Sequence, residues 1–222
     1  PMHAKAFATG VRIEHPQSMV NLSQYGKESV EGLGAAAYKL TANLPSGRGV
    51  YTFCMCPGGY VVNASSEEGR IAVNGMSYHA RDGKNANSAV VVTVDPADFG
   101  SDSPLAGMEF QRRLEEAAFK AGRGKIPVQL YEDFCKNQPS AGPGAVTPMI
   151  KGVYDWSNVR SIFPEEIGDA LAMGIREFDK KLKGYARGDA VLSGVESRTS
   201  SPVRIPRDET FQSSVRGLYP CG

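Results

Sequence analysis

The chain has 222 residues, enough for one large domain or two small ones with a sizeable buried core. Hydrophobic residues make up 41% and charged residues 22%, as in ordinary globular proteins, and the net charge of +1 gives no reason to expect nucleic acid as a partner. The longest apolar runs are too short to cross a bilayer and no signal peptide is visible, so we expect a cytoplasmic protein with no membrane partner.

The first part of the chain is predicted to form short strands separated by turns. Alternating or β-branched residues predict strands at residues 5–15, 37–43, 49–56, 59–64, 70–76 and 88–94. Turn residues rich in Gly, Pro and Ser separate several of these runs, and a short helical turn is expected at residues 16–25. This pattern indicates an antiparallel sheet or a barrel.

The pattern then changes to helices. Ser103 and Pro104 are typical of a helix start, and an apolar stripe runs from there to Gly122. Residues 137–148 are predicted to be a loop, and residues 164–183 a second helix with a regular apolar face.

Strand signals return at residues 190–195, 202–205 and 217–220. We therefore predict an α+β fold: an antiparallel β-sheet or barrel-like domain interrupted by a helical insertion, with the final strands rejoining the sheet. The expected parts are residues 1–103 and 188–222 for the β-rich domain and residues 104–187 for the helical insertion.

No motif identifies a reaction by itself. The chain lacks a Gly-x-Gly-x-x-Gly after a strand, a phosphate-binding P-loop and a Gly-x-Ser-x-Gly elbow. Its four cysteines show no zinc-binding spacing and indicate a reduced protein. Cys54 and Cys56 are too close to bridge easily, and on a regular strand both would point to the same face.

The first candidate cluster lies around a proline-glycine turn. Cys54 and Cys56 precede Pro57, Gly58 and Gly59, and two glycines allow a sharp turn or close backbone approach to a ligand. The alternative is a plain hairpin turn with two small buried thiols.

The second cluster combines several polar groups within residues 79–87. His79, Arg81, Asp82, Asn85 and Asn87 offer an imidazole, a guanidinium, a carboxylate and two amides that can orient a polar substrate or a flavin edge. The alternative is a solvated loop of turn-forming residues.

The third cluster is rich in arginine and hydroxyl groups. Glu196, Arg198, Thr199, Ser200 and Arg204 lie within nine residues, and arginine can clamp a carboxylate or phosphate with two parallel hydrogen bonds. The alternative is an edge strand and loop with surface charges.

The chain starts at Pro1 and stops at Gly222, just after the apolar run 217–219. A strand followed by glycine is how many phosphate-binding turns begin, so we expect the chain to be a fragment of a longer protein.

These segments together resemble a family of bacterial FAD-dependent, or NAD(FAD)-utilising, dehydrogenases. The resemblance is carried by residues 6–17, 23–26, 53–60, 74–87, 104–110, 196–207 and 217–222. The run Arg-Thr-Ser-Ser-Pro-Val-Arg at 198–204 is quite specific, whereas residues 137–159 match least.

The resemblance implies a longer parent protein in which a Rossmann-type FAD domain precedes and follows this chain. It implies that this chain is the substrate-side cap over the reactive face of the flavin, with the Pro57–Gly58–Gly59 turn and the Arg198 segment as candidates to face the isoalloxazine and the substrate. FAD would then be bound in the parent and not by this fragment, NAD(P)H is a second candidate cofactor, and the missing FAD domain and an unknown small molecule are the expected partners. The resemblance assigns no catalytic residue.

Two hypotheses follow from the sequence. The first is part of a flavin-dependent oxidoreductase, inactive as an isolated fragment, which predicts an apolar concave face where the FAD domain packs. The second is a non-enzymatic ligand-binding or interaction module with the same cap fold, which predicts a polar surface there. A weaker third idea, a thiol-redox role for Cys54 and Cys56, requires an accessible thiolate of low pKa.

Overall fold

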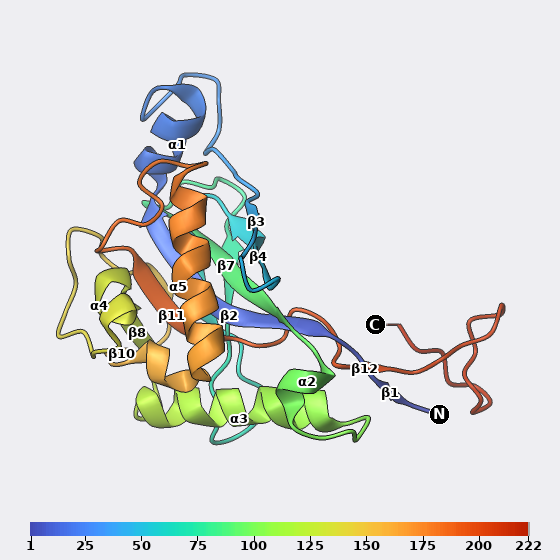
Figure 1. Ribbon diagram of the computed structural model, residues 1–222. Coiled ribbons are helices and arrows are strands. Elements are labelled where there is room, and N and C mark those ends of the chain that lie inside the picture. Colours follow the sequence, from blue (N-terminus) through green and yellow to red (C-terminus); the bar gives the residue numbers. More distant parts are fainter. Residues whose placement is uncertain (222) are drawn as a thin grey trace.

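The computed structural model describes residues 1–221, and its centre is a seven-stranded sheet (Figure 1). The strand order is β10-β8-β11-β2-β7-β4-β3, and all neighbours are antiparallel except β10 and β8. In chain order the strands are β2 (Phe7–Pro16), β3 (Thr41–Asn43), β4 (Gly49–Cys56), β7 (Asn85–Val94), β8 (Ile126–Leu130), β10 (Tyr154–Trp156) and β11 (Val191–Glu196).

Strands β2 and β7 form the middle of the sheet and are paired along their whole length, from Phe7 opposite Val94 to Pro16 opposite Asn85. Both are almost entirely buried, because other layers cover both faces of the sheet. Successive side chains of a strand point to opposite faces, so β2 presents Val11 and Ile13 to the main apolar core and Arg12 to the other face.

Helices cover one face of the sheet (Figure 1). They are α2 (Pro96–Phe99), α3 (Ala106–Ala121), α4 (Tyr131–Lys136), the 3-10 helix η1 (Val159–Ile162) and α5 (Glu165–Asp179). The apolar stripe of α5 packs against β7 and β4, and Gly174 lies so close to Val50 that a Cβ there would be 2.4 Å from a methyl carbon. The core is continuous along this layer.

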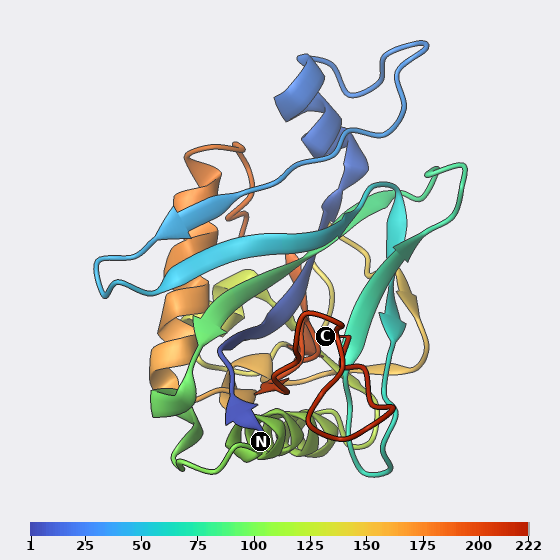
Figure 2. The same ribbon diagram turned by 90° about the vertical axis from the view of Figure 1, so that its right-hand side faces the viewer.

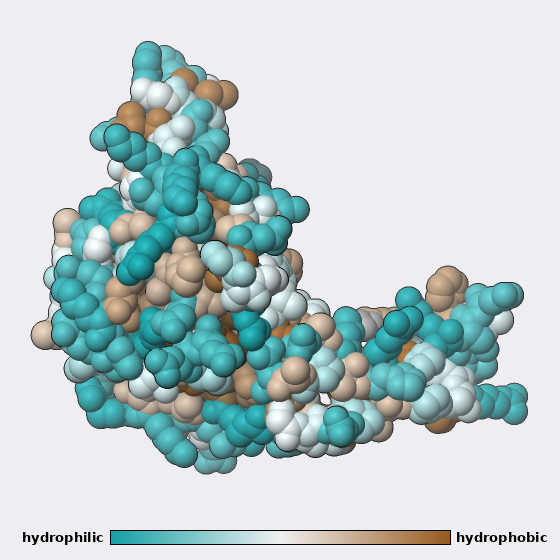
Figure 3. Space-filling view, in the orientation of Figure 1, coloured by the Kyte–Doolittle hydropathy of each residue, from teal (hydrophilic) through white to brown (hydrophobic). Residues whose placement is uncertain are grey.

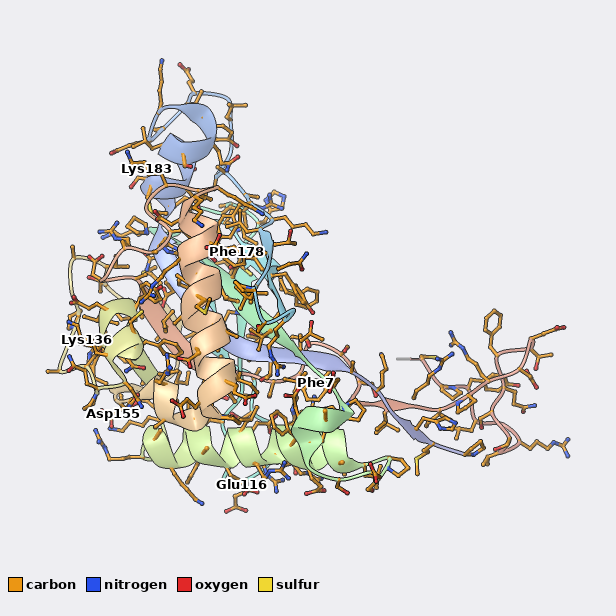
Figure 4. The ribbon with its side chains drawn as sticks, in the orientation of Figure 1. Phe7, Glu116, Lys136, Asp155, Phe178 and Lys183 are labelled. Carbon is orange, nitrogen blue, oxygen red and sulfur yellow. The ribbon has the colours of Figure 1, made fainter. Side chains whose placement is uncertain are left out.

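Two aromatic clusters mark opposite ends of the helical layer, where Figure 4 labels Phe7 and Phe178. Phe7 stacks on Phe99 with ring centroids 5.4 Å apart, and Phe178 meets Tyr185 edge-on at 5.5 Å. Aromatic pairs of this kind add to the burial of apolar area.

A second, three-stranded sheet covers the other face of the central strands (Figure 2). Its strands are β5 (Gly59–Asn63), β6 (Val73–Ser77) and β9 (Ile150–Lys151), in the order β6-β5-β9. Strand β6 contacts β2, β4, β7 and β11, so Arg12 is enclosed between two sheets. Helix α1 (Gln17–Tyr25) follows β2 directly and protrudes at one end.

The two chain ends form a projecting arm. Strands β1 (His3–Ala4) and β12 (Val203–Arg204) pair antiparallel, with Ala4 opposite Val203. Figure 3 shows this arm leaving the body, so that the outline is concave between the arm and the end that carries α1. The strand predicted at residues 217–220 is wrong, because Gly217 lies in a turn in which the Leu218 amide donates to the Val215 carbonyl, and residues 218–220 form no regular secondary structure.

The predicted α+β fold with an antiparallel-dominated sheet is confirmed, and β11 rejoins the early strands. The segment 104–187 contributes α3, α4 and α5, but also β8 and β10, which extend the same sheet and which the sequence did not predict. The predicted strand 37–43 is ordered as a strand only over Thr41–Asn43. Helix α3 begins later than Ser103, whose hydroxyl accepts the Leu105 amide ahead of the helix.

Candidate functional site

The candidate site is a hollow where the end of β4 meets strand β6 and the loop after it. Its volume is about 850 Å³, and it is lined by residues 54–57 and 74–81 together with Gly34 and Ala35. Five residues of the predicted clusters line it: Cys54, Cys56, Pro57, His79 and Arg81. The fold therefore joins the first and second predicted clusters into one site.

Strand β4 is irregular at the hollow. Its register with β7 shifts between Phe53 and Cys56, and Cys54 has a φ of 42°, a left-handed conformation that non-glycine residues rarely adopt. The expectation that Cys54 and Cys56 share one face of a regular strand is wrong, because this irregularity breaks the alternation. Cys54 is exposed and Cys56 is half-buried.

A fully buried arginine, Arg12 of β2, holds this irregular backbone from behind. Its Nη1 donates to the Cys54 carbonyl at 2.7 Å and to Asn87 Oδ1 at 3.0 Å. Its Nη2 donates to Asn74 Oδ1 at 2.8 Å, and its Nε pairs with Glu196 Oε2 at 2.8 Å. One guanidinium thus ties together groups from β4, β6, β7 and β11.

Strand β6 can lie this close to Arg12 only because it has a glycine at position 75. A Cβ on Gly75 would be 2.3 Å from both Arg12 Nη1 and Asn87 Oδ1, which no side chain tolerates. The Gly75 amide also donates to Asn74 Oδ1 at 2.7 Å. The glycine therefore closes the second sheet over the buried charge.

Burial dominates the electrostatics behind the hollow. It raises the pKa of Glu196, and the adjacent Arg12 guanidinium offsets part of that rise. Burial also raises the pKa of the Cys56 thiol, which lowers the fraction of thiolate near neutral pH. That direction is opposite to the one a thiol-redox role for this cysteine requires.

The predicted turn at residues 57–59 forms the corner of the hollow and is locked to the 78–83 loop. Gly58 has a φ of +48° and lies against the Arg81 carbonyl, where an added Cβ would be only 1.9 Å away. The Gly83 amide donates to the Gly58 carbonyl at 3.1 Å, and the Gly58 amide donates to Gln17 Oε1 at 2.7 Å. Arg81 itself has a φ of 51°.

Tyr78 forms an exposed aromatic wall of the hollow. Its ring meets that of Tyr60 edge-on with centroids 5.6 Å apart. The Lys151 ammonium lies 4.5 Å from the Tyr60 centroid and 5.2 Å from the Tyr78 centroid. These cation–π contacts hold the wall in place and put a positive charge beside it.

The other residues of the second cluster lie deeper. Asn87 contacts Arg12 as described, and Asn85 donates its amide to Glu14 Oε2 at 3.0 Å and to the Thr147 carbonyl at 2.9 Å. Asn85 and Thr147 line a separate hollow beside α1. Burial raises the pKa of Glu14 to about 7, although Asn85 and the Met149 amide hydrogen-bond its carboxyl.

Only Glu196 of the third cluster lies near the hollow. Arg198 instead clamps the buried Glu115 carboxylate with two hydrogen bonds of 2.8 Å, and the Thr199 hydroxyl donates to the Ala8 carbonyl. Ser200 lines a groove beside Arg198, and Arg204 lines a hollow in the arm. The structure therefore does not bring these residues to the candidate site.

Sequence reasoning missed Arg12, Glu14 and Asn74. The available signal was the alternation of the charged residues Arg12 and Glu14 with the apolar residues Val11 and Ile13. Such alternation ordinarily indicates that the charged face of the strand is exposed to solvent, so it did not point to a buried site. Within residues 1–221 no group of three or more His, Cys, Asp or Glu side chains is placed to hold a metal ion. None of the helices described over the same residues is long and apolar enough to span a membrane.

Replacing Arg12 with Met is expected to reduce the free energy of unfolding by about 3–5 kcal/mol, because Glu196 would be left buried without its partner. The double variant Arg12→Met, Glu196→Gln should recover part of this loss in urea denaturation. As a control, Lys180→Met removes an exposed ion pair with Glu177 and should cost at most about 1 kcal/mol. A double variant no more stable than Arg12→Met would contradict the role given to the ion pair.

Replacing Glu14 with Gln is expected to change how stability depends on pH. The pKa of Glu14 is about 7 in the folded chain against an ordinary value of 4.5, so this residue stabilises the fold below pH 4.5 and that contribution is lost as the pH rises through 7. Glutamine does not titrate, so the variant does not lose stability at this position as the pH rises. The variant should therefore gain on the order of 3 kcal/mol relative to the wild type between pH 4 and pH 8.

The measurement for Glu14 is urea denaturation at both pH values, with the exposed Glu31→Gln as the control. The neighbouring His15, whose pKa burial lowers to about 4, is present in every chain and cancels in the difference. An equal stability difference at the two pH values would show that the Glu14 carboxyl is not protonated preferentially in the fold.

The comparisons with known proteins concern nearly the whole chain. A family model described as "FAD-dependent protein, C-terminal domain-like" matches residues 6–199. A protein of Clostridium beijerinckii, described as an uncharacterized protein, is 55% identical over 226 aligned residues, which cover all of this chain and 42% of that relative. The chain thus spans less than half the length of this relative. It belongs to the family of FAD-dependent protein C-terminal domain-like domains.

Proposed function

We propose that this domain is the substrate-side wall of a flavin-dependent oxidoreductase, with the hollow at residues 54–57 and 74–81 facing the reactive side of the flavin. The observation that carries the proposal is the strained backbone at this hollow, in a domain that belongs to a family of FAD-dependent proteins. Of the five non-glycine residues with positive φ in residues 1–221, Cys54 and Arg81 both line it. Backbone strain of this kind concentrates at functional sites, and the family is one of FAD-dependent proteins.

The residues of this chain fit contact with a flavin ring but not the holding of a whole FAD. The hollow offers Tyr78, Met55 and Met76 as flat or adaptable apolar surface. The sequence has no glycine-rich strand-to-helix turn for a pyrophosphate. We therefore assign the holding of FAD to another part of a longer polypeptide, consistent with the greater length of the relative.

In this arrangement the flavin would supply the transfer of hydride to or from a small-molecule substrate. The chain's own contribution would be to orient the substrate and exclude water from the space between the two domains. Arg12 would act through position only, by fixing the Cys54 carbonyl and the Asn74 side chain, because its guanidinium is fully buried. NAD(P)H remains a candidate source or acceptor of the hydride.

The concave side of the molecule is the proposed contact with the FAD-holding part. Large apolar side chains exposed on this chain include Phe53, which is next to Cys54 of the hollow, and Phe211, Leu218 and Tyr219 in the residues that follow the arm. The hollow itself is mixed in character, with His79 and Arg81 beside its apolar residues. This mixture is less apolar than a pure domain contact predicts and is typical of a site that also binds a substrate.

An absorbance spectrum tests the proposal. The longer protein that contains this domain and the isolated chain would be expressed identically and purified. We expect the visible absorbance bands of a bound flavin in the longer protein and none in the isolated chain. The isolated chain should also show no turnover with added FAD. A longer protein that stays colourless after incubation with FAD would contradict the proposal and favour a non-enzymatic binding module.

A further inference from the structure

The charge of the hollow indicates what kind of molecule it binds. Its lining contains Arg81 and His79 and no carboxylate, although the whole chain has 24 acidic residues against 25 lysines and arginines. The Lys151 ammonium lies against Tyr78 and adds a positive charge at the border. Glu196, the buried carboxylate behind the hollow, is paired with Arg12. Asp82 follows Arg81 in the chain but is not a lining residue. A negatively charged group that enters the hollow therefore meets only neutral or basic lining side chains.

Arg81 is available to such a group. Most arginines of the domain are committed to carboxylates, among them Arg12, Arg48, Arg70, Arg112, Arg160, Arg187 and Arg198. Arg81 makes no ion pair and no side-chain hydrogen bond among residues 1–221, and it is exposed at the rim. Its guanidinium retains all the donors that can grip a carboxylate in a two-point contact.

The backbone that carries Arg81 is fixed before any ligand binds. The Arg81 amide donates to the Tyr78 carbonyl at 3.0 Å, and its carbonyl packs against Gly58. This packing maintains the left-handed conformation of Arg81 against its intrinsic cost. A binding group on a fixed loop loses less entropy when it engages a ligand.

Asn74 offers a second fixed donor. Its Oδ1 accepts from Arg12 Nη2 and from the Gly75 amide, which determines the orientation of the side-chain amide. Its Nδ2 has no acceptor among residues 1–221, and Asn74 is an exposed lining residue. The buried arginine thus orients an N–H group at the surface of the hollow.

The rest of the lining fits an apolar body. Met55 and Met76 are adaptable apolar side chains, and the Tyr78 ring packs against the edge-on ring of Tyr60 and the Lys151 ammonium. A purely inorganic anion would leave this surface unused.

We propose that the hollow binds an organic carboxylate with an apolar or aromatic body, gripped through Arg81 and the Asn74 amide and packed on Tyr78. The ligand is a substrate only if the proposed flavin-dependent function holds, and in that respect the inference rests on that function. As a binding site it stands on this chain alone.

The test is a titration of the isotope-labelled chain, followed by amide NMR signals, with phenylacetate as the probe and neutral phenylacetamide as its matched control. Phenylacetate should shift the signals of residues 54–57 and 74–81 and bind about tenfold more tightly than phenylacetamide, the difference expected of a charge-assisted contact. Arg81→Gln should remove that difference, and Arg81→Lys should retain part of it. Arg216→Gln, at an exposed arginine without an ion pair, should bind like the wild type.

Either of two results would overturn the proposal: equal binding of the two probes, or unchanged preference for phenylacetate in Arg81→Gln with the spectrum otherwise that of a folded chain. The titration needs no flavin. A bound carboxylate with a colourless longer protein would reject the oxidoreductase and keep the site, whereas flavin in the longer protein without carboxylate preference would reject the substrate class alone.

Discussion

The buried guanidinium of Arg12 is the constraint on which the candidate site depends. A charge enclosed between two sheets is costly unless it is paired and hydrogen-bonded, and here Glu196, Asn87, Asn74 and the Cys54 carbonyl accept hydrogen bonds from four of the five N–H groups of the guanidinium. These partners come from four different strands. The network can form only when both sheets are in place, so the polar layer selects one packing of β6 over the central strands, with Gly75 making the approach sterically allowed.

The same constraint gives the hollow its shape. Arg12 holds the β4 backbone where Cys54 leaves the regular strand, and on the opposite side Gly58 holds the carbonyl of Arg81. Both lining residues adopt a conformation that the chain would otherwise avoid. The interior interactions therefore fix the position of exposed groups. Domain packing onto a flavin would use a surface that is already ordered, which lowers the entropy lost on association.

The sequence predicted those parts of the fold whose signal is local. The alternation in residues 7–16 predicted a strand, and the apolar face of α5 predicted a helix. Strand β8 and helix α4 were not predicted, because Pro127 lies within this short strand and a short helix follows it directly. The hollow was predicted only in pieces. The composition of the segment around Arg198 predicted that this arginine belongs to the site. In the structure, Arg198 instead donates to the carboxylate of Glu115, which is distant in sequence. Arg12 was overlooked because its partners lie at positions 54, 74, 87 and 196, and no local pattern relates them.

If the hollow faces the flavin, bound FAD shields it from solvent, and hydrogen–deuterium exchange of the longer protein with and without FAD measures that shielding. FAD is expected to slow exchange in peptides covering residues 54–60 and 74–84. Peptides from α4, on the helical side of the sheet, should exchange at the same rate in both states. Protection confined to other parts of this domain, with residues 54–60 and 74–84 unchanged, would show that the hollow does not face the flavin.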